Sequence, residues 1–162
     1  PKKEKMLSKT LQMHYGYTPL HTYINIQYSV PAEWLKYGDK LCGVSFDGRR
    51  TYYEGGSLNG NTLSFRTRSL GEYAITYDNV PPVAKTISFG KKYRFRVTDN
   101  LSGVSSVKCY IEDKWILAEY EPKTGAVWGE IPSWIKPGTY EFKLVARDDK
   151  GNKTEIKKSI TL

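Results

Sequence analysis

The 162-residue sequence has few of the residues from which enzymes build reactive sites. It contains two cysteines, Cys42 and Cys109, which form neither a CxxC metal pair nor a disulfide framework. Each lies among alternating apolar residues, so we expect two buried free thiols. No G-x-S-x-G elbow is present, and a Ser-His-Asp hydrolase therefore has no recognisable nucleophile.

Histidine is equally scarce. His14 and His21 are the two present, and their spacing matches neither HExxH nor HxH. A catalytic zinc ion normally has three protein ligands held by rigid elements, so we expect no metal site, no cofactor and no catalytic residue in this chain. A hydrolase with an atypical site remains an alternative, but the sequence shows no convergent polar groups for it.

Long apolar runs are also missing. No segment has the length of a transmembrane helix, and no charged-then-apolar signal peptide opens the chain. The sequence begins with Pro1-Lys2-Lys3 instead of an initiator methionine. We therefore expect it to be a piece of a longer protein.

What the chain does have is aromatic and strand-forming residues. Aromatic residues make up 14% of the sequence, including 13 tyrosines and 4 tryptophans, which favours β-sheets over helices. The formal charge is +8. Residues 1–78 contain 10 basic and 7 acidic residues, and residues 79–162 contain 15 basic and 10 acidic residues, so the excess of positive charge is spread over both halves. The basic residues alternate with apolar ones, as in residues 93–97, which is typical of the outer face of a strand. They do not cluster, so we expect no nucleic-acid partner.

Alternating patterns predict two groups of strands. The first group comprises residues 21–30, 41–46, 50–54, 62–68 and 72–77. Asp-Gly, Gly-Gly and Asn-Gly dipeptides between these strands are typical of tight turns. The second group comprises residues 86–89, 93–98, 106–112, 115–121, 126–130, 139–147 and 154–162. Seven strands in about 80 residues match the strand count of an immunoglobulin-like (Ig-like) sandwich.

Between the groups the chain reads "YDNVPPV". Neither Pro81 nor Pro82 donates a backbone hydrogen bond, so the first sheet must end there. The fold class is therefore predicted as all-β, with two tandem Ig-like β-sandwich domains. Residues 1–20 are expected to be an N-terminal linker or a first strand, 21–78 a small β-sandwich, 79–83 a proline hinge and 84–162 a seven-stranded Ig-like sandwich. Asp78, Asn79, Pro81 and Pro82 make up the interdomain hinge.

Carboxylates gather at Asp99, at Asp148-Asp149 and at Asp78. Oxygen ligands near an interdomain linker are compatible with calcium. Ordinary turns, in which Asp and Asn side chains bond their own backbone, explain the same residues with fewer assumptions.

The aromatic residues offer a candidate binding surface. Trp34 and Trp134 lie beside proline-bearing loops, and with Tyr52 and Tyr53 they could stack on sugar rings or on a protein partner. Trp115 and Trp128 are expected to pack in the core instead. The full set expected to be buried is Ile24, Ile26, Phe65, Tyr73, Phe95, Cys109, Trp115, Phe142 and Leu144.

Five stretches also resemble a known family. They are "PLHTYINIQYSVP", "VSFDGRRTYYEGG", "SLGEYAITYDNVPPV", "FRVTDNLSGVSSVKCYIEDKWILAEYEPKTG" and "GTYEFKLVARDDKGNKTE". Together they resemble the C-terminal, non-catalytic region of large lysostaphin-type zinc metallopeptidases of Gram-negative gut bacteria. The resemblance implies a parent enzyme that cuts peptidoglycan cross-links with zinc held by HxxxD and HxH motifs. Here Thr18 follows His14 by four residues and no HxH occurs, so no catalytic residue carries over.

The resemblance favours a non-catalytic accessory module that positions or shields the catalytic domain at the cell envelope, in the periplasm or on the outer surface. Its expected partners are that catalytic domain and peptidoglycan or another envelope glycan. The alternative is an independent carbohydrate-binding or adhesive module. Fold alone does not decide between them.

Overall fold

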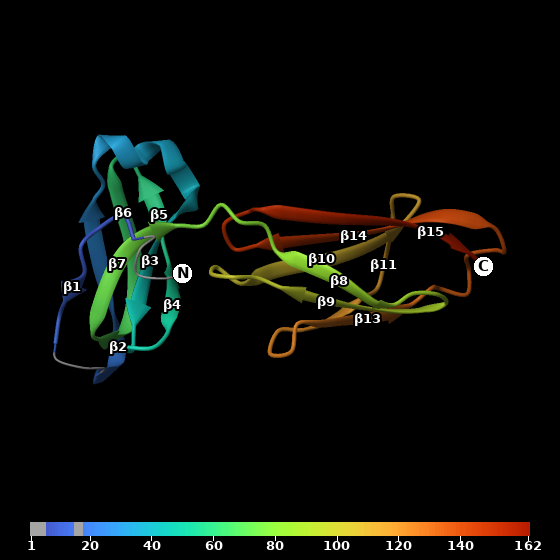
Figure 1. The fold of residues 1–162 in the computed structure, drawn as a ribbon, viewed down its shortest axis with the longest axis horizontal. Coiled ribbons are helices and arrows are strands. Elements are labelled where there is room, and N and C mark those ends of the chain that lie inside the picture. The colour runs from blue at the N-terminus through green and yellow to red at the C-terminus, as the bar shows by residue number, and fades with distance from the viewer. Residues whose placement is uncertain (1–5, 15–17) are drawn as a thin grey trace. The chain divides into compact units, whose positions relative to one another are not determined.

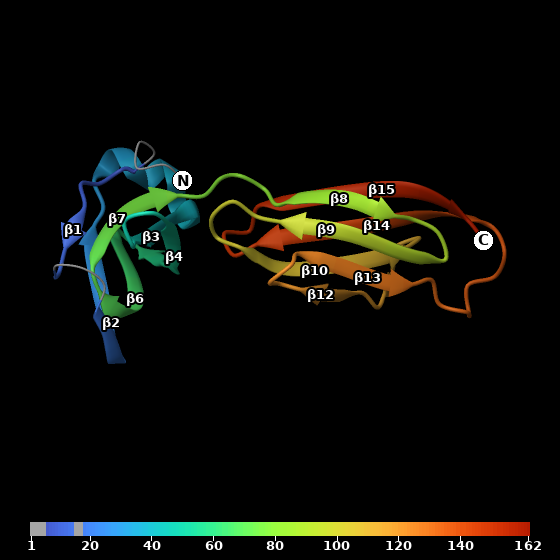
Figure 2. The ribbon, with the colours of Figure 1, turned by 60° about the horizontal axis from the view of Figure 1, so that its bottom comes forward.

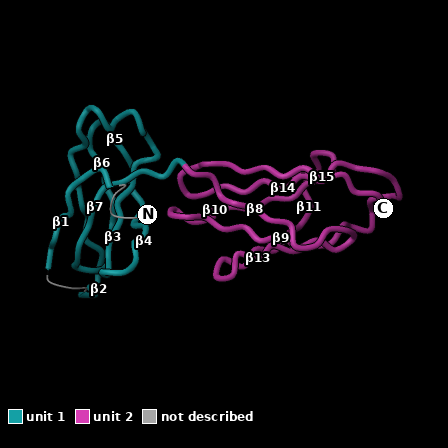
Figure 3. The backbone as a smooth tube through the Cα atoms, viewed as in Figure 1, with its two compact units in different colours: residues 1–79 teal, residues 80–162 magenta. Residues whose placement is uncertain are grey.

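The computed structural model describes residues 6–14 and 18–162, which are mostly strands with one 3-10 helix (Figure 1). The chain divides into two compact units, residues 1–79 and 80–162 (Figure 3). Each unit consists of antiparallel sheets around its own hydrophobic core. The prediction of an all-β sandwich fold is confirmed.

The first unit has two sheets, with strand orders β1-β7-β3-β4 and β2-β6-β5. Its elements are β1 (Leu11–Gln12), β2 (Thr18–Ser29), the 3-10 helix η2 (Ala32–Lys40), β3 (Leu41–Phe46), β4 (Thr51–Gly55), β5 (Ser57–Asn59), β6 (Thr62–Leu70) and β7 (Glu72–Tyr77). Strand β6 alternates strictly, with Leu63 and Phe65 buried and Arg66 and Arg68 exposed. This period-two pattern gives the sheet one core face and one solvent face.

The 3-10 helix was not predicted, and it changes the position of one candidate residue. Trp34 lies on η2, and its ring stacks on that of Tyr28 with centroids 6.0 Å apart. It is half-buried against the core of the first unit. The expectation that Trp34 is exposed is therefore wrong, because the helix folds its side chain back onto the sheet. Ile24 is also only half-buried, whereas Ile26, Phe65 and Tyr73 are buried as expected.

The second unit has two four-stranded sheets, β12-β13-β9-β8 and β11-β10-β14-β15 (Figure 2). Its strands are β8 (Val83–Ser88), β9 (Lys92–Thr98), β10 (Val104–Ile111), β11 (Lys114–Ile116), β12 (Glu119–Glu121), β13 (Ala126–Glu130), β14 (Thr139–Asp148) and β15 (Lys153–Thr161). Apart from the short β11, the seven strands have the Ig-like order. The first, second, fourth and fifth of them (β8, β9, β12 and β13) form one sheet, and β10, β14 and β15 form the other.

Aromatic rings fill the core of the second unit. Phe95 and Phe142 come from opposite sheets and stack with centroids 5.6 Å apart, and Tyr93 lies 5.0 Å from Phe142. Cys109 and Leu144 are fully buried beside them, as the alternation predicts. These contacts join the two sheets of the unit.

The second unit also has a tyrosine corner. Near the start of β14, the hydroxyl of Tyr140 donates a hydrogen bond to the carbonyl oxygen of Lys136, four residues earlier, at 3.1 Å. Ig-like domains have such a tyrosine at the corner leading into the corresponding strand. This local feature agrees with the strand order.

One predicted strand, residues 115–121, is wrong. The structure has two short strands there, and they belong to different sheets, since β11 pairs with β10 and β12 pairs with β13. The chain crosses between the sheets at Leu117, whose carbonyl oxygen accepts a hydrogen bond of 2.8 Å from the hydroxyl of Tyr93. The second unit therefore has eight described strands, not the seven expected.

The two tryptophans assigned to this core lie outside it. Trp115 is 59% exposed, because the buried residue of β11 is its neighbour Ile116. Trp128 is half-buried on the outer face of β13, because Val127 points inward. Both expectations are wrong for the same reason, since adjacent residues of a strand face opposite sides.

The segments at the predicted domain boundaries are also described. Within residues 1–20, β1 pairs with β7 and β2 already begins at Thr18, while residues 1–5 and 15–17 lie outside the described residues. Asp78 is buried, and its amide donates to the carbonyl of Lys40 at 3.0 Å. In the second unit, the hydroxyl of Thr154 donates to the carbonyl of Pro82.

Candidate functional site

The first unit has a cleft of about 630 Å³, which we call the arginine–tyrosine cleft. It lies where side chains of β2 and β6 face those of β3, β4 and the turn between them. It is lined by Tyr23, Ser45, Asp47, Tyr52, Glu54, Arg66, Thr67, Arg68 and Ser69. Its open shape and mixed lining suit a ligand that has both apolar and charged groups.

The inner part of the cleft is formed by hydroxyl groups. Thr67 and Ser69 occupy core-facing positions of β6 and are buried. The hydroxyl oxygen of Tyr73 lies 3.0 Å from that of Thr67 and 2.9 Å from that of Ser69, and it also lies 2.7 Å from the carbonyl oxygen of Ser69. The apolar core of the first unit thus ends beside the cleft in three hydroxyl groups that are hydrogen-bonded to one another.

The acidic groups of the cleft are bonded to neighbours on their own strands and turn. Asp47 accepts hydrogen bonds from the hydroxyl of Tyr52 at 2.5 Å and from the amides of Arg49 and Arg50 at 3.0 and 2.8 Å. The Tyr52 bond first, and then the two amides, lower the pKa of Asp47 to about 2. The same bond raises the pKa of Tyr52. Asp47 is therefore an ionised carboxylate at neutral pH, with three donors of its own.

Glu54 is held in the same way. It lies on β4, which pairs with β3, and the hydroxyl of Ser45 on β3 donates to its carboxylate at 2.6 Å. The two acids of the cleft thus take their hydrogen bonds from β3, β4 and the connecting turn.

The basic groups of the cleft are held over an aromatic ring. The guanidinium carbons of Arg66 and Arg68 lie 4.6 and 5.2 Å from the ring centre of Tyr23. Arg68 also donates to the backbone carbonyl of His21 at 3.1 Å. Neither arginine forms an ion pair within the described part of the chain. Each therefore presents positioned N–H donors to a ligand, which is the geometry that favours carboxylate recognition.

The predicted binding residues do not gather at one place. Tyr52 is in the cleft and is 44% exposed. Tyr53, its neighbour on β4, points to the other side of the strand and is half-buried. Trp34 packs against the core of the first unit, and Trp134 is 59% exposed in the second unit.

Sequence reasoning missed Tyr23, Arg66, Arg68 and Asp47. A signal was available in "FRTRSL", where Thr67 and Ser69 occupy the positions that continue the buried row of β6. Small polar residues on the core side of a strand indicate that the core ends there.

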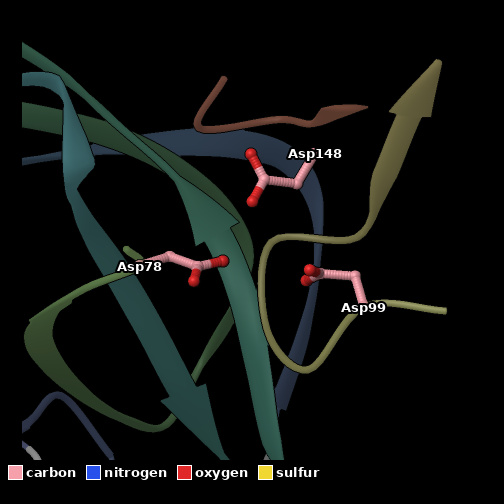
Figure 4. A group of neighbouring side chains, drawn as sticks. All are labelled: Asp78, Asp99 and Asp148. Carbon is pink, nitrogen blue, oxygen red and sulfur yellow. The ribbon is translucent and has the colours of Figure 1, made fainter. Parts of the chain in front are cut away.

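Asp99 and Asp148 serve turns of the second unit (Figure 4). One oxygen of Asp99 accepts hydrogen bonds from the amides of Leu101 and Gly103 at 2.8 and 2.9 Å. Asp148 accepts from the amide and the side chain of Asn152 at 2.8 and 2.6 Å. One carboxylate oxygen of Asp99 lies within 4.8 Å of one carboxylate oxygen of Asp148. Asp78, also drawn in Figure 4, belongs to the first unit. Asp99 and Asp148 thus bond the backbone of their own turns, which is the role that the sequence favoured.

The histidines have backbone or local roles. His14 lies 3.3 Å from the hydroxyl of Thr18 through its Nδ1, and His21 contributes its carbonyl to Arg68. Neither belongs to a group of three or more metal-ligating side chains within residues 6–14 and 18–162.

The first unit is a β-sandwich with a polar cleft, and an Ig-like unit follows it in the chain. Residues 1–78 match the sequence model of the Zu5-like domain family, an accessory-type domain. The match has nearly the bounds of the first unit, which ends at Asn79. No curated protein matches the chain. In the described residues, no helix has the length and hydropathy needed to cross a membrane.

Proposed function

We propose that this chain is a non-catalytic accessory module of a peptidoglycan-cleaving zinc endopeptidase, and that the arginine–tyrosine cleft binds a carboxylate-bearing part of the cell wall. The match of the first unit to an accessory-type domain supports the module role. The resemblance described above supports the parent enzyme. On this proposal the module is located at the envelope of a Gram-negative bacterium, and its partners are peptidoglycan and the catalytic domain.

The observation that carries the binding proposal is the separation of charges within one cleft. Asp47 and Glu54 take hydrogen bonds from their own neighbours, and Arg66 and Arg68 are stacked on Tyr23 instead of pairing with them. A ligand carboxylate would find two positioned guanidinium groups whose donors are not used by the protein's acids. Stem peptides of peptidoglycan have such carboxylates, and its sugar rings present C–H faces to exposed tyrosines.

The proposal is tested by co-sedimentation of the full chain with isolated peptidoglycan sacculi at low and near-physiological salt. Arg66→Gln/Arg68→Gln removes both guanidinium groups, and each charge-assisted bond contributes about 1.5–3 kcal/mol. Because 1.4 kcal/mol corresponds to tenfold in affinity, we expect binding at least about tenfold weaker. Lys9→Gln/Lys36→Gln removes the same charge from exposed positions of the first unit outside the cleft and should leave binding within about twofold.

Two comparisons decide the result. Equal loss in both double variants would show that binding follows net charge alone, and would contradict the cleft assignment. Sacculi whose carboxylates have been converted to neutral amides by carbodiimide coupling should bind more weakly than untreated sacculi, since the stem peptides then offer no carboxylate. Undiminished binding to the amidated sacculi would contradict the carboxylate anchor.

The second candidate is an independent carbohydrate-binding or adhesive module. The exposure of Tyr23 and Tyr52, at 51% and 44%, within one cleft favours it. This function predicts binding to neutral glycans that depends on Tyr23→Ala and is insensitive to Arg66→Gln. The peptidoglycan proposal predicts instead that binding to sacculi is weakened by Arg66→Gln.

A further inference from the structure

The β12-β13-β9-β8 sheet of the second unit has charged and aromatic side chains on its outer face, and the proposed function does not use them. Strand β9 buries Tyr93, Phe95 and Val97 and turns Arg94 and Arg96 outward. Its neighbours β8 and β13 continue this outward face on either side. The face is therefore a sheet surface on which outward side chains of neighbouring strands stand in rows.

One row crosses the sheet from an acid through an aromatic ring to a cation. Glu119 of β12 lies opposite Trp128 of β13, and Trp128 lies opposite Arg94 of β9. We call these three residues the Glu119–Trp128–Arg94 row. Neighbouring strands lie about 4.8 Å apart, so the two charged positions stand about 10 Å from each other with the indole between them.

Further cations lie on the Arg94 side of Trp128. A hollow of about 780 Å³ is lined there by Ile87, Arg94, Phe95, Arg96, Lys123, Thr124, Ala126, Val127 and Trp128, with no acid among them. Lys85 lies opposite Arg96 on β8. A second hollow of about 490 Å³ shares Arg94 and Trp128 with the first and includes Glu119, and in it Lys92 is paired with Glu130 at 2.8 Å.

The cations beside Trp128 are not neutralised. In the described part of the chain, Lys85, Arg94, Arg96 and Lys123 form no ion pair within 4.0 Å. The carboxylate of Glu121 accepts from the backbone amide of Lys123 at 3.0 Å.

The outer face of the opposite sheet has both paired and unpaired cations. Lys143 is paired with Asp113, Lys157 with Glu141 and Lys153 with Glu155, whereas Lys108 and Arg147 form no ion pair within the described residues. The Trp128 face is therefore distinguished by its row of acid, indole and cation, and not by unpaired cations alone.

We propose that the Glu119–Trp128–Arg94 row binds an acidic sugar of a polysaccharide. The C–H face of the pyranose ring would stack on Trp128, its carboxylate would pair with Arg94, and a hydroxyl on the far edge would donate to Glu119. Arg96, Lys85 and Lys123 would face the carboxylates of neighbouring sugars. One repeating unit thus complements all three members of the row.

The acid in the row favours a sugar over other polyanions. Glu119 would repel a phosphodiester chain or an anionic lipid surface, whereas it accepts a hydrogen bond from a sugar hydroxyl. Single-stranded nucleic acids are held by several aromatic rings that stack successive bases, and here the hollow has one outward aromatic ring. This inference concerns the second unit and goes beyond the proposed function of the cleft.

The test is a calorimetric titration of the full chain with polygalacturonate oligomers. We expect Arg94→Gln/Arg96→Gln and Trp128→Ala each to weaken binding about tenfold or more. Lys108→Gln/Arg147→Gln removes the same charge from exposed positions of the opposite sheet and should change affinity by less than about twofold. None of these side chains belongs to the core, and thermal unfolding of each variant checks that the fold is kept.

Glu119→Ala gives the sharpest outcome, because two mechanisms predict opposite signs. Removal of a negative charge strengthens binding if the face attracts polyanions by charge alone. It weakens binding if Glu119 accepts a sugar hydroxyl, and we expect a loss of about three- to tenfold. Tighter binding by Glu119→Ala would overturn the proposal.

Three other results would also overturn the proposal. The first is an equal loss of affinity in Lys108→Gln/Arg147→Gln, and the second is tighter binding of single-stranded DNA or of phosphatidylglycerol vesicles than of polygalacturonate. The third is loss of polygalacturonate binding in Arg66→Gln/Arg68→Gln, because that result would assign the binding to the arginine–tyrosine cleft. A failure of sacculus binding with intact polygalacturonate binding would affect the proposed function alone.

Discussion

Replacement of Gly43 by alanine should destabilise the first unit by an amount that the structure allows us to work out. Gly43 lies on β3 and faces the ring of Phe65, which is 3% exposed. A Cβ added there would stand 2.6, 2.6 and 2.7 Å from three ring carbons, whereas ordinary contacts begin at 3.4 Å. The overlap is about 0.8 Å, and the buried ring has little room to move.

Overpacking of this kind costs about 1–3 kcal/mol. For a unit of about 80 residues, each kcal/mol lowers the melting temperature by about 4–8 °C. Urea unfolding followed by amide NMR signals would measure the free energy of unfolding of each unit separately. Signals of residues 80–162 serve as an internal control and should keep their midpoint.

Gly71→Ala is the matched control. An added Cβ at Gly71 meets nothing within 4 Å, and its φ is not in the left-handed region. We expect it to be neutral or to stabilise by up to about 1 kcal/mol, because alanine restricts the unfolded chain. If Gly43→Ala were no less stable than Gly71→Ala, the packing of β3 against Phe65 described above would be refuted.

Three further predictions concern single side chains. Tyr52→Phe removes the main bond that depresses the pKa of Asp47, so an NMR titration should show that pKa rising from about 2 towards 3.8; a value still near 2 would contradict this. Since the native pKa is the lower one, the stability that the ionised carboxylate contributes is present above about pH 4 and is lost as the pH falls through 2. Burial raises the pKa of the Cys109 thiol to about 12, so a thiol reagent at pH 8 should label it only after the second unit unfolds, and rapid labelling of folded protein would contradict its burial. Tyr140→Phe should lower the free energy of unfolding of the second unit by about 0.5–1.5 kcal/mol in urea titrations, and an unchanged value would argue against the tyrosine corner.

Alternation in the sequence was sufficient to find most of the strands. Phe95 and Phe142 each have charged neighbours on both sides, so their inward orientation follows from the period of two. Such segments carry their own register, because a slip of one residue would expose the whole apolar row.

Trp115 shows where that reasoning ends. Its orientation depends on the two-residue turn at Glu112 and Asp113, both of which have positive φ, as a tight hairpin requires. Asp113 is a residue type that tolerates positive φ, but Glu112 is not, so the pairing of Trp115 with Tyr110 on the outer face was not visible.

The cleft was only partly predictable. Tyr52 was chosen for its aromatic ring and does line the cleft. Arg66 and Arg68 looked like ordinary solvent-facing residues, because the ring that holds them, Tyr23, belongs to a strand about 40 residues earlier. Sequence patterns describe which side of a strand a residue faces, but not which distant side chain meets it there.

The crossing at Leu117 has a consequence for self-association. Because the chain leaves one sheet just after Ile116 and joins the other at Glu119, each sheet ends on that side in a strand of three residues. Long, flat, apolar edges are templates on which further strands add and aggregates grow. Here both edges are too short to template much pairing, and one of them bears Glu119 and Glu121. A single change of sheet thus protects two open edges at once.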